Sequence, residues 1–364
     1  MNTDLTKPDI LRWLRESDPA RLEELWQHAD QTRRRHVGDA VYLRGLVEIS
    51  NFCARQCAYC GLRAGNDRLA RYRLVADEIF GAAQQAVKFG YGTVVLQAGE
   101  DYGLTAPWLE DIIRWIKNET PLAVTLSLGE RPDRELALWR EAGADRYLLR
   151  FETSDRHLFE EIHPPLGNRP SDRIAILKRL KALGYETGSG IMVGIPGQTY
   201  ASVASDIDLF RQMDLDMIGI GPFIAHPATP LGSGFNVFPP VNREQVPNTE
   251  LMVYKVVALT RLVRPDANIP ATTALATINK KNGRELGLQR GANVFMPNLT
   301  PLKYRRLYEI YPAKACIAET GDQCHGCLGA RIRSIGRHLG RGQGGRWTRQ
   351  MMAEPPTERN LCHA

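Results

Sequence analysis

The feature that most limits the fold of this chain is a repeated alternation between short β-rich runs and longer helical patterns. Eight β-rich runs occur, and most of them are followed by a stretch with helical periodicity. Strands that alternate with helices form parallel sheets, because each helix carries the chain back across the sheet. The predicted strands are 45–50, 93–97, 122–128, 145–150, 186–193, 216–220, 269–273 and 293–296.

Eight strand-then-helix units predict an α/β fold, a complete (β/α)8 barrel of the TIM type with N- and C-terminal helical extensions. An open, doubly wound sheet is the alternative. We expect an N-terminal helical extension over 1–40, the barrel over 41–312, and a C-terminal segment with a basic tail over 313–364. In such barrels the chemistry takes place at the C-terminal ends of the strands. Functional residues should therefore follow the predicted strands.

The ends of the chain and its hydropathy indicate a soluble protein. Hydrophobic residues make up 43% of the 364 residues, which is enough to fill a large core. Residues 1–40 are charged and lack the apolar region of a signal peptide. No stretch approaches the roughly 18 consecutive apolar residues of a membrane span. We therefore expect a cytoplasmic protein with no membrane partner.

The net charge of +6 comes largely from local clusters, such as 33–35 and 331–349. These clusters could bind nucleic acid or an acidic partner, or they could be solvated surface. The basic tail contains no interleaved aromatic residue apart from Trp347 and no recognisable nucleic-acid module. We therefore expect no nucleic-acid partner.

The cysteines indicate metal binding. Six of the seven form two tight triplets, at 53–60 and 316–327. Clusters of three cysteines at such short spacing rarely form disulfides, and a cytoplasmic chain keeps its thiols reduced. The seventh cysteine, Cys362, is expected to be a free thiol.

The first triplet, Cys53, Cys57 and Cys60, has the spacing C-x3-C-x2-C and directly follows the first predicted strand. Three thiolates on one loop can bind three irons of a 4Fe–4S cubane and leave the fourth iron without a protein ligand. An open iron can bind and activate a small molecule, whereas a ferredoxin-type cluster needs a fourth cysteine nearby. The alternative is a structural zinc site, although zinc usually uses paired C-x2-C units.

Polar residues follow several predicted strands. Thr125 and Ser127 lie two apart in an apolar run and so share one face, where their hydroxyls need partners. Arg150 and Glu152 also share a face, and Glu152 either pairs with Arg150 or binds a ligand. Arg173 starts a predicted helix, from which its guanidinium could bind a carboxylate bidentately.

The cysteine spacing, the aromatic Tyr59 before the last cysteine, and the position after the first strand resemble the radical S-adenosylmethionine (SAM) superfamily. The resemblance implies a catalytic 4Fe–4S cluster on Cys53, Cys57 and Cys60, with SAM chelating the open iron. A one-electron reductant would reduce the cluster, and reductive cleavage of SAM would give a 5′-deoxyadenosyl radical.

Two further segments resemble SAM-binding motifs of that superfamily. Residues 97–101 (QAGED) resemble its GGE segment, with Ala98 in place of the first glycine. Residues 188–197 (GSGIMVGIPG) resemble its adenine-binding segment. The residues that the resemblance places at the cofactor are Tyr59, Gly99, Glu100, Ser127, Arg150, Glu152, Arg173 and Met192.

Longer segments resemble one family within the superfamily, the FeFe-hydrogenase maturases of the HydE type. Among them are 49–63 (ISNFCARQCAYCGLR), 184–199 (GYETGSGIMVGIPGQT) and 216–230 (DMIGIGPFIAHPATP), and the resemblance spans roughly 40–330. It implies a role in assembling the diiron subsite of the hydrogenase H-cluster. The residues that would contact the substrate are Thr125, Ser127, Thr272 and Thr273.

The same resemblance implies the substrate and the partners. The substrate would be a small organometallic iron–cysteine complex, delivered by a tyrosine-lyase maturase. The adenosyl radical would attack the cysteine sulfur of that complex, and a scaffold GTPase maturase would be a further partner.

The second triplet, Cys316, Cys324 and Cys327, lies beyond the last predicted strand. In some members of the family a second cluster, of the 2Fe–2S type, occupies this spacing. The alternative is three reduced surface thiols that bind metal only opportunistically.

Three other functions remain open from the sequence. A sulfur-inserting enzyme of the biotin-synthase type would need an auxiliary cluster deep in the barrel. An enzyme of the methylornithine-synthase type would share the barrel. A non-catalytic Fe–S scaffold would share the cysteines but would not cleave SAM.

Overall fold

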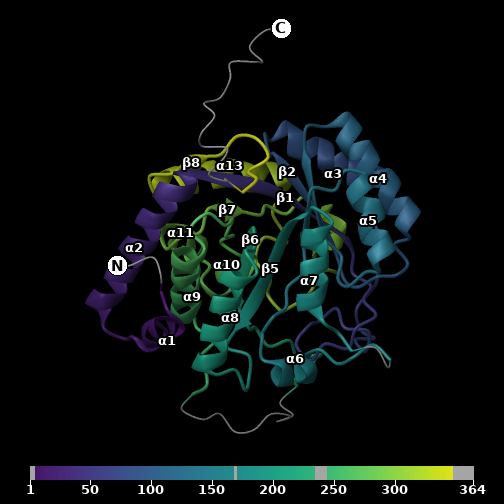
Figure 1. The fold of residues 1–364 in the computed structure, drawn as a ribbon. Coiled ribbons are helices and arrows are strands. Elements are labelled where there is room, and N and C mark those ends of the chain that lie inside the picture. Colours follow the sequence, from purple (N-terminus) through teal and green to yellow (C-terminus); the bar gives the residue numbers. More distant parts are fainter. Residues whose placement is uncertain (1–4, 168–169, 234–243, 347–364) are drawn as a thin grey trace.

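The computed structural model describes residues 5–167, 170–233 and 244–346 (Figure 1). A parallel β-sheet forms its centre, with the strand order β6-β5-β4-β3-β2-β1-β7, and β8 pairs with the start of β1. All pairings are parallel, as the alternation of elements predicts. The strands are β1 Ala40–Ser50, β2 Thr93–Ala98, β3 Ala123–Ser127, β4 Arg146–Leu148, β5 Glu186–Val193, β6 Met217–Pro222, β7 Val294–Phe295 and β8 His338–Leu339.

Helices cover the outer face of this sheet (Figure 1). Helix α4 shows why: Leu109, Ile112, Ile113 and Ile116 recur at helical spacing, form one apolar stripe and are all buried. In the described ranges, no helix is long and apolar enough to cross a membrane. The helices are α1 Lys7–Arg15, α2 Pro19–Val37, α3 Ala76–Lys88, α4 Ala106–Glu119, α5 Asp133–Glu141, α6 Arg156–Ile162, α7 Arg173–Ala182, α8 Tyr200–Gln212, α9 Glu250–Val263, α10 Thr273–Ile278, α11 Gly283–Gln289, α12 Leu302–Arg305 and α13 Gly321–Ser334.

The sheet is curled, and the prediction of a complete (β/α)8 barrel is not confirmed. The predicted strand 269–273 does not form a strand. Instead, single bridges join Asn268 to Met217 in β6 and Pro270 to Val294 in β7. Pro270 has no N–H to donate to a ladder, which explains why pairing stops after isolated contacts.

The helical extension at the N-terminus consists of α1 and α2, which pack against α8 and α9. At the C-terminal end of the described chain, the segment after β8 lies under the N-terminal ends of the strands. The main-chain carbonyls of Gln343 and Gly344 accept hydrogen bonds from the buried side chains of Arg44, Thr93 and Arg146. These carbonyls supply acceptors that buried guanidinium groups need.

A buried ion pair fixes another part of the C-terminal segment. Glu48 in β1 is completely buried, and its Oε1 contacts Nζ of Lys314. Asn298 donates from Nδ2 to the other carboxylate oxygen at 3.1 Å. The Lys314 ammonium also lies 4.9 Å from the centroid of the Tyr308 ring. This pair therefore anchors the chain just beyond Tyr308 to the inside of the sheet.

We expect Lys314→Met to lower the free energy of unfolding by about 3 kcal/mol or more, because it leaves a buried carboxylate without its charge partner. Adding Glu48→Leu should recover most of the loss, since both charges are then absent. Chemical denaturation measures both effects. The control is Lys303→Met, which removes an exposed ion pair with Glu78 and should change little. Equal stability of the Lys303 and Lys314 variants would contradict the role of the pair.

Candidate active site

A cavity of about 320 Å³ lies at the carboxyl ends of the central strands. In a curled parallel sheet, functional residues usually lie at these ends of the strands. Nine of the residues predicted from the sequence line it, whereas Cys53, Cys57, Gly99, Glu100 and Thr125 do not. The nine are Tyr59, Cys60, Ser127, Arg150, Glu152, Arg173, Met192, Thr272 and Thr273.

The cysteine loop follows β1 and reaches the edge of this cavity. Cys57 is buried, Cys53 and Cys60 are half-buried, and all three are free thiols. Burial raises the pKa of each thiol, that of Cys60 to about 12, and negative charge on any one would raise the pKa of another. All three thiols belong to the one loop that follows β1. Iron binding would have to release their protons.

This donor set fits a 4Fe–4S cluster with one open iron. In the part of the chain that the structure describes, no three His, Cys, Asp or Glu side chains are arranged to share a single metal ion. A cubane does not require such an arrangement, because each cysteine binds a different iron. Three free thiols on one loop at the edge of the cavity match that need, and Cys53, Cys57 and Cys60 would hold the cluster.

Gly99 and Glu100 contact the start of the cysteine loop instead of lining the cavity. A Cβ on Gly99 would lie 2.2 Å from the carbonyl oxygen of Phe52 and 2.8 Å from Cβ of Cys53, so only glycine allows this approach. The next residue, Glu100, donates its N–H to Sγ of Cys53 at 3.4 Å and accepts from the N–H of Ala54 at 2.9 Å. The segment that resembles the GGE motif thus supports the predicted cluster ligands.

Glu152 presents a carboxylate to the cavity from a strained backbone. Its φ of 62° lies in the left-handed region, which costs a non-glycine residue about 1 kcal/mol or more. Oε2 lies 3.0 Å from Nη2 of Arg150, so the predicted shared face is observed as an ion pair. The same oxygen accepts no hydrogen bond, although the side chain is largely buried. Because Glu152 also lines the cavity, its carboxylate could accept a hydrogen bond from a ligand there.

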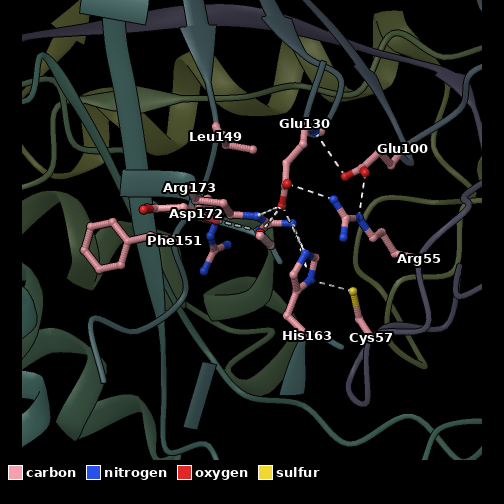
Figure 2. Close-up of polar contacts among 12 residues, drawn as sticks. Arg55, Cys57, Glu100, Glu130, Leu149, Phe151, His163, Asp172 and Arg173 are labelled. Atoms are coloured by element: carbon pink, nitrogen blue, oxygen red, sulfur yellow. Dashed lines mark hydrogen bonds and ion pairs between the residues drawn. The ribbon is translucent and has the colours of Figure 1, made fainter. Parts of the chain in front are cut away.

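Glu130 is the acceptor at the centre of a buried polar network (Figure 2). Its Oε1 accepts from Nε of Arg173 at 3.0 Å, lies 3.1 Å from Nε2 of His163, and also accepts from Oγ of Ser171. Arg173 is the first residue of α7, and it donates from Nη1 to the carbonyl oxygen of Arg150 at 2.6 Å. These bonds fix the Arg173 guanidinium at the cavity wall.

The network continues to the cysteine loop. Arg55, between the first two cysteines, donates to Glu130 at 2.7 Å and to Glu100 at 2.6 Å. His163 lies 3.0 Å from Sγ of Cys57 through Nδ1 (Figure 2). The sequence analysis did not single out Glu130, Arg55 or His163. Two features of the sequence could have identified part of this network: Glu130 is a charged residue directly after the third strand, and Arg55 is a charged residue inside the cysteine loop.

The two hydroxyls predicted on β3 have different surroundings. Ser127 lines the cavity, whereas Thr125 lies one layer deeper and is 2% exposed. The Thr125 Oγ1 atom has no hydrogen-bond partner in the described structure. The shared face is therefore observed, but the structure does not bring Thr125 to the cavity.

Thr272 and Thr273 lie at the start of α10 and form another part of the wall. Thr272 donates from Oγ1 to the carbonyl oxygen of Ile220 at 3.1 Å, and Thr273 Oγ1 accepts from Arg284 at 3.0 Å. Tyr308, Ile310 and Tyr311 also line the cavity. Sequence analysis missed these three because they follow a short helix and not a strand.

The second cysteine triplet is only partly described. Cys316 is half-buried with a φ of 63°, and Nη1 of Arg284 lies 3.4 Å from its Sγ. Cys327 is exposed on α13. The side chain of Cys324 and all of Cys362 lie outside the described residues, so the second cluster and the free thiol stay predictions.

A family model described as the radical SAM superfamily matches residues 47–210. The [FeFe] hydrogenase maturase subunit HydE of Thermotoga maritima is 47% identical over 324 residues, which cover 89% of each chain. The chain belongs to the HydE family of radical SAM proteins. The predicted family is thereby confirmed, with the cysteine loop and strands β2 to β5 inside the matched region.

Two methylornithine synthases are more distant from this HydE-family chain than the Thermotoga maritima protein. The 3-methylornithine synthase of Methanosarcina acetivorans is 28% identical over 80% of this chain and 78% of that enzyme. The crystal structure of methylornithine synthase (PylB) superimposes with a TM-score of 0.78 at 24% identity, and covers 93% of this chain and 94% of that one. At this identity the superposition shows a common fold.

The Glu130 network should make the stability of the protein depend on pH. Burial alone would raise the pKa of Glu130, but bonds and charges from His163, Arg173, Ser171 and Arg55 outweigh it and lower this pKa well below its ordinary value. A lowered folded-state pKa adds stability above the unfolded value of about 4.3, and this stability is lost as the pH falls further.

We therefore expect Glu130→Gln to lower the free energy of unfolding by about 3 kcal/mol at about pH 7, because the buried cations lose their charge partner. The difference from the unmodified protein should shrink as the pH falls below about 4. Denaturation curves at a series of pH values measure it. Glu110→Gln, which affects only a surface pair with Arg114, is the control. A difference that stays constant with pH would refute this account.

Proposed function

We propose that this chain is a radical SAM enzyme that acts in building the diiron subsite of the FeFe-hydrogenase H-cluster. Membership of the HydE family supports the process. The observation that carries the chemistry is the position of three free thiols on one loop whose last cysteine, Cys60, lines a cavity at the strand ends. A zinc site would not need that cavity or the carboxylate that Glu152 adds to its wall.

When bound, the cluster and SAM would together supply a 5′-deoxyadenosyl radical. Cys53, Cys57 and Cys60 would hold the cluster. Glu152 lines the cavity, and its carboxylate would suit the ammonium or a ribose hydroxyl of SAM. Arg173 lies at the same wall and offers a cation for the SAM carboxylate.

The rest of the SAM site would come from neighbouring strand ends. Met192 in β5 offers an apolar surface for the adenine ring, and Ser127 in β3 offers a hydroxyl. Arg150 lines the same cavity and forms an ion pair with Glu152. Tyr59 contributes a wall beside Cys60.

The substrate would occupy the part of the cavity near Thr272, Thr273, Tyr308 and Tyr311. We propose a small organometallic iron–cysteine complex, whose cysteine sulfur is attacked by the radical. A tyrosine-lyase maturase would deliver it, and a scaffold GTPase maturase and a one-electron reductant would complete the set of partners in the cytoplasm.

Two finer structural proposals accompany this function. The bridges of residues 268–270 to both edge strands would complete the ring of the barrel over residues 41–312, between an N-terminal extension (1–40) and a C-terminal segment (313–364). The triplet Cys316, Cys324 and Cys327 would bind a peripheral 2Fe–2S cluster. A biotin-synthase type of chemistry would instead need its auxiliary cluster inside the barrel, where the described residues of this triplet do not line the cavity.

We expect Cys57→Ala to abolish both the 4Fe–4S cluster and reductive cleavage of SAM, since the two remaining thiols cannot hold a cubane with one open iron. Iron content, EPR of the dithionite-reduced protein and 5′-deoxyadenosine yield measure this. The matched control is Cys327→Ala, an exposed thiol whose loss should leave cleavage largely unchanged. Deoxyadenosine production by the Cys57 variant would disprove the proposed site.

A cysteine-derived iron carbonyl complex should increase the yield of deoxyadenosine from the anaerobic, reduced protein. Stimulation supports the maturase function. Cleavage without stimulation would mean that a different substrate is used, as in a methylornithine-synthase type of enzyme. An intact cluster without cleavage would favour a scaffold.

Cys324→Ala should retain cleavage of SAM if the second cluster is peripheral. Loss of all activity in this variant would contradict a peripheral cluster.

A further inference from the structure

Asp206 is a buried acidic residue that the proposed chemistry does not use. It lies on the inner face of α8, among the apolar residues Val203, Ile207 and Phe210. Its side chain is completely buried. Its Oδ1 accepts from the N–H of Ser154 at 2.5 Å and also from Oγ of Ser154. Ser154, from which Asp206 accepts both hydrogen bonds, lies in the loop between β4 and α6.

Burying this carboxylate is unfavourable. Burial raises the pKa of Asp206 to about 7, although the hydrogen bonds from Ser154 lower it in part. An apolar residue at this position would continue the stripe that packs α8 on the sheet. A buried carboxylate that persists in an apolar face needs a local reason, and its bonds to Ser154 give one.

The loop that Asp206 contacts contains the strained part of the cavity wall. The N–H of Thr153 donates to the carbonyl oxygen of Phe151 at 2.7 Å, which forms a three-residue γ-turn around Glu152. With a φ of 62° at its central residue, this is the rare and strained form of the turn. Such a conformation persists only when its surroundings hold it.

Hydrogen bonds hold the turn on both sides. On one side, Glu152 pairs with β5, because its N–H donates to Gly190 at 3.0 Å and its carbonyl accepts from Met192 at 3.2 Å. On the other side, Ser154 is bound by Asp206, and Asp155 caps α6. Asp206 is thus the side chain that ties the far side of the turn to an outer helix.

We propose that Asp206 is a positioning residue of the SAM site, which binds Ser154 and thereby holds the γ-turn that directs the Glu152 carboxylate into the cavity. This inference rests on the proposed function, in which Glu152 contacts SAM. Asp206 does not line the cavity and acts only through the turn.

The test measures SAM affinity of the cluster-loaded protein by equilibrium binding, with iron content measured alongside. Asp206→Ala should weaken SAM binding about tenfold. This is the size expected when SAM loses one hydrogen bond to the charged Glu152 carboxylate. Asp206→Asn should bind nearly as the unmodified protein, because its amide oxygen can still accept from Ser154. Asp208→Ala removes a carboxylate from the same helix away from the turn and is the control.

A double-variant cycle separates positioning from general damage. If Asp206 acts through Glu152, Asp206→Ala should cause no further loss of SAM affinity in a Glu152→Gln background. An equal loss in both backgrounds, or unchanged affinity in the single Asp206→Ala variant, would overturn the inference.

Ser154→Ala keeps the inference testable if Asp206→Ala does not fold or load its cluster. This variant removes one of the two hydrogen bonds to Asp206, and it should weaken SAM binding to a smaller extent. Unchanged affinity would then overturn the inference. If the cluster-loaded unmodified protein itself binds no SAM, the proposed function fails and this inference fails with it. Normal SAM binding by the unmodified protein with no effect of either variant overturns this inference alone.

Discussion

The site depends on one buried carboxylate that is shared by three loops. Glu130 follows β3 and binds Arg55 of the cysteine loop, together with His163 and Arg173 around the start of α7. These segments are far apart in the sequence, and a parallel sheet brings them together because its strands all end at the same edge. Without this acceptor, the Arg173 guanidinium at the wall of the cavity would lose its carboxylate partner, and Arg55 would keep only Glu100.

Local patterns were sufficient to predict the parallel α/β fold and to place most of the cavity. The strand-end rule located Ser127, Glu152 and Met192 because a strand of known direction fixes where its last residues lie. The rule failed at 269–273, where apolar residues predicted a strand but Pro270 cannot pair on both sides.

Other parts of the site could not be predicted because they depend on pairings between distant segments. A single sequence shows that Glu130 is charged and follows a strand, but not that its partners arrive from residues 55 and 163–173. Thr125 shows a second limit of the sequence. The alternation of side chains along a strand predicts that Thr125 and Ser127 share a face, but it does not predict how far each lies from the cavity, and Thr125 lies below it. Tyr308 and Tyr311 line the cavity, and the Glu48–Lys314 pair anchors the chain beyond them to β1.

Two glutamates near the cavity have different roles. Glu130 does not line the cavity, and its carboxylate accepts hydrogen bonds from donors of the protein. Glu152 has one cationic neighbour and an oxygen without a hydrogen bond, and its backbone is strained. A buried carboxylate with unused acceptor capacity is unfavourable until something binds it. The groups that bind one another around Glu130 therefore build the frame of this site, whereas Glu152 lines the space where a ligand would bind.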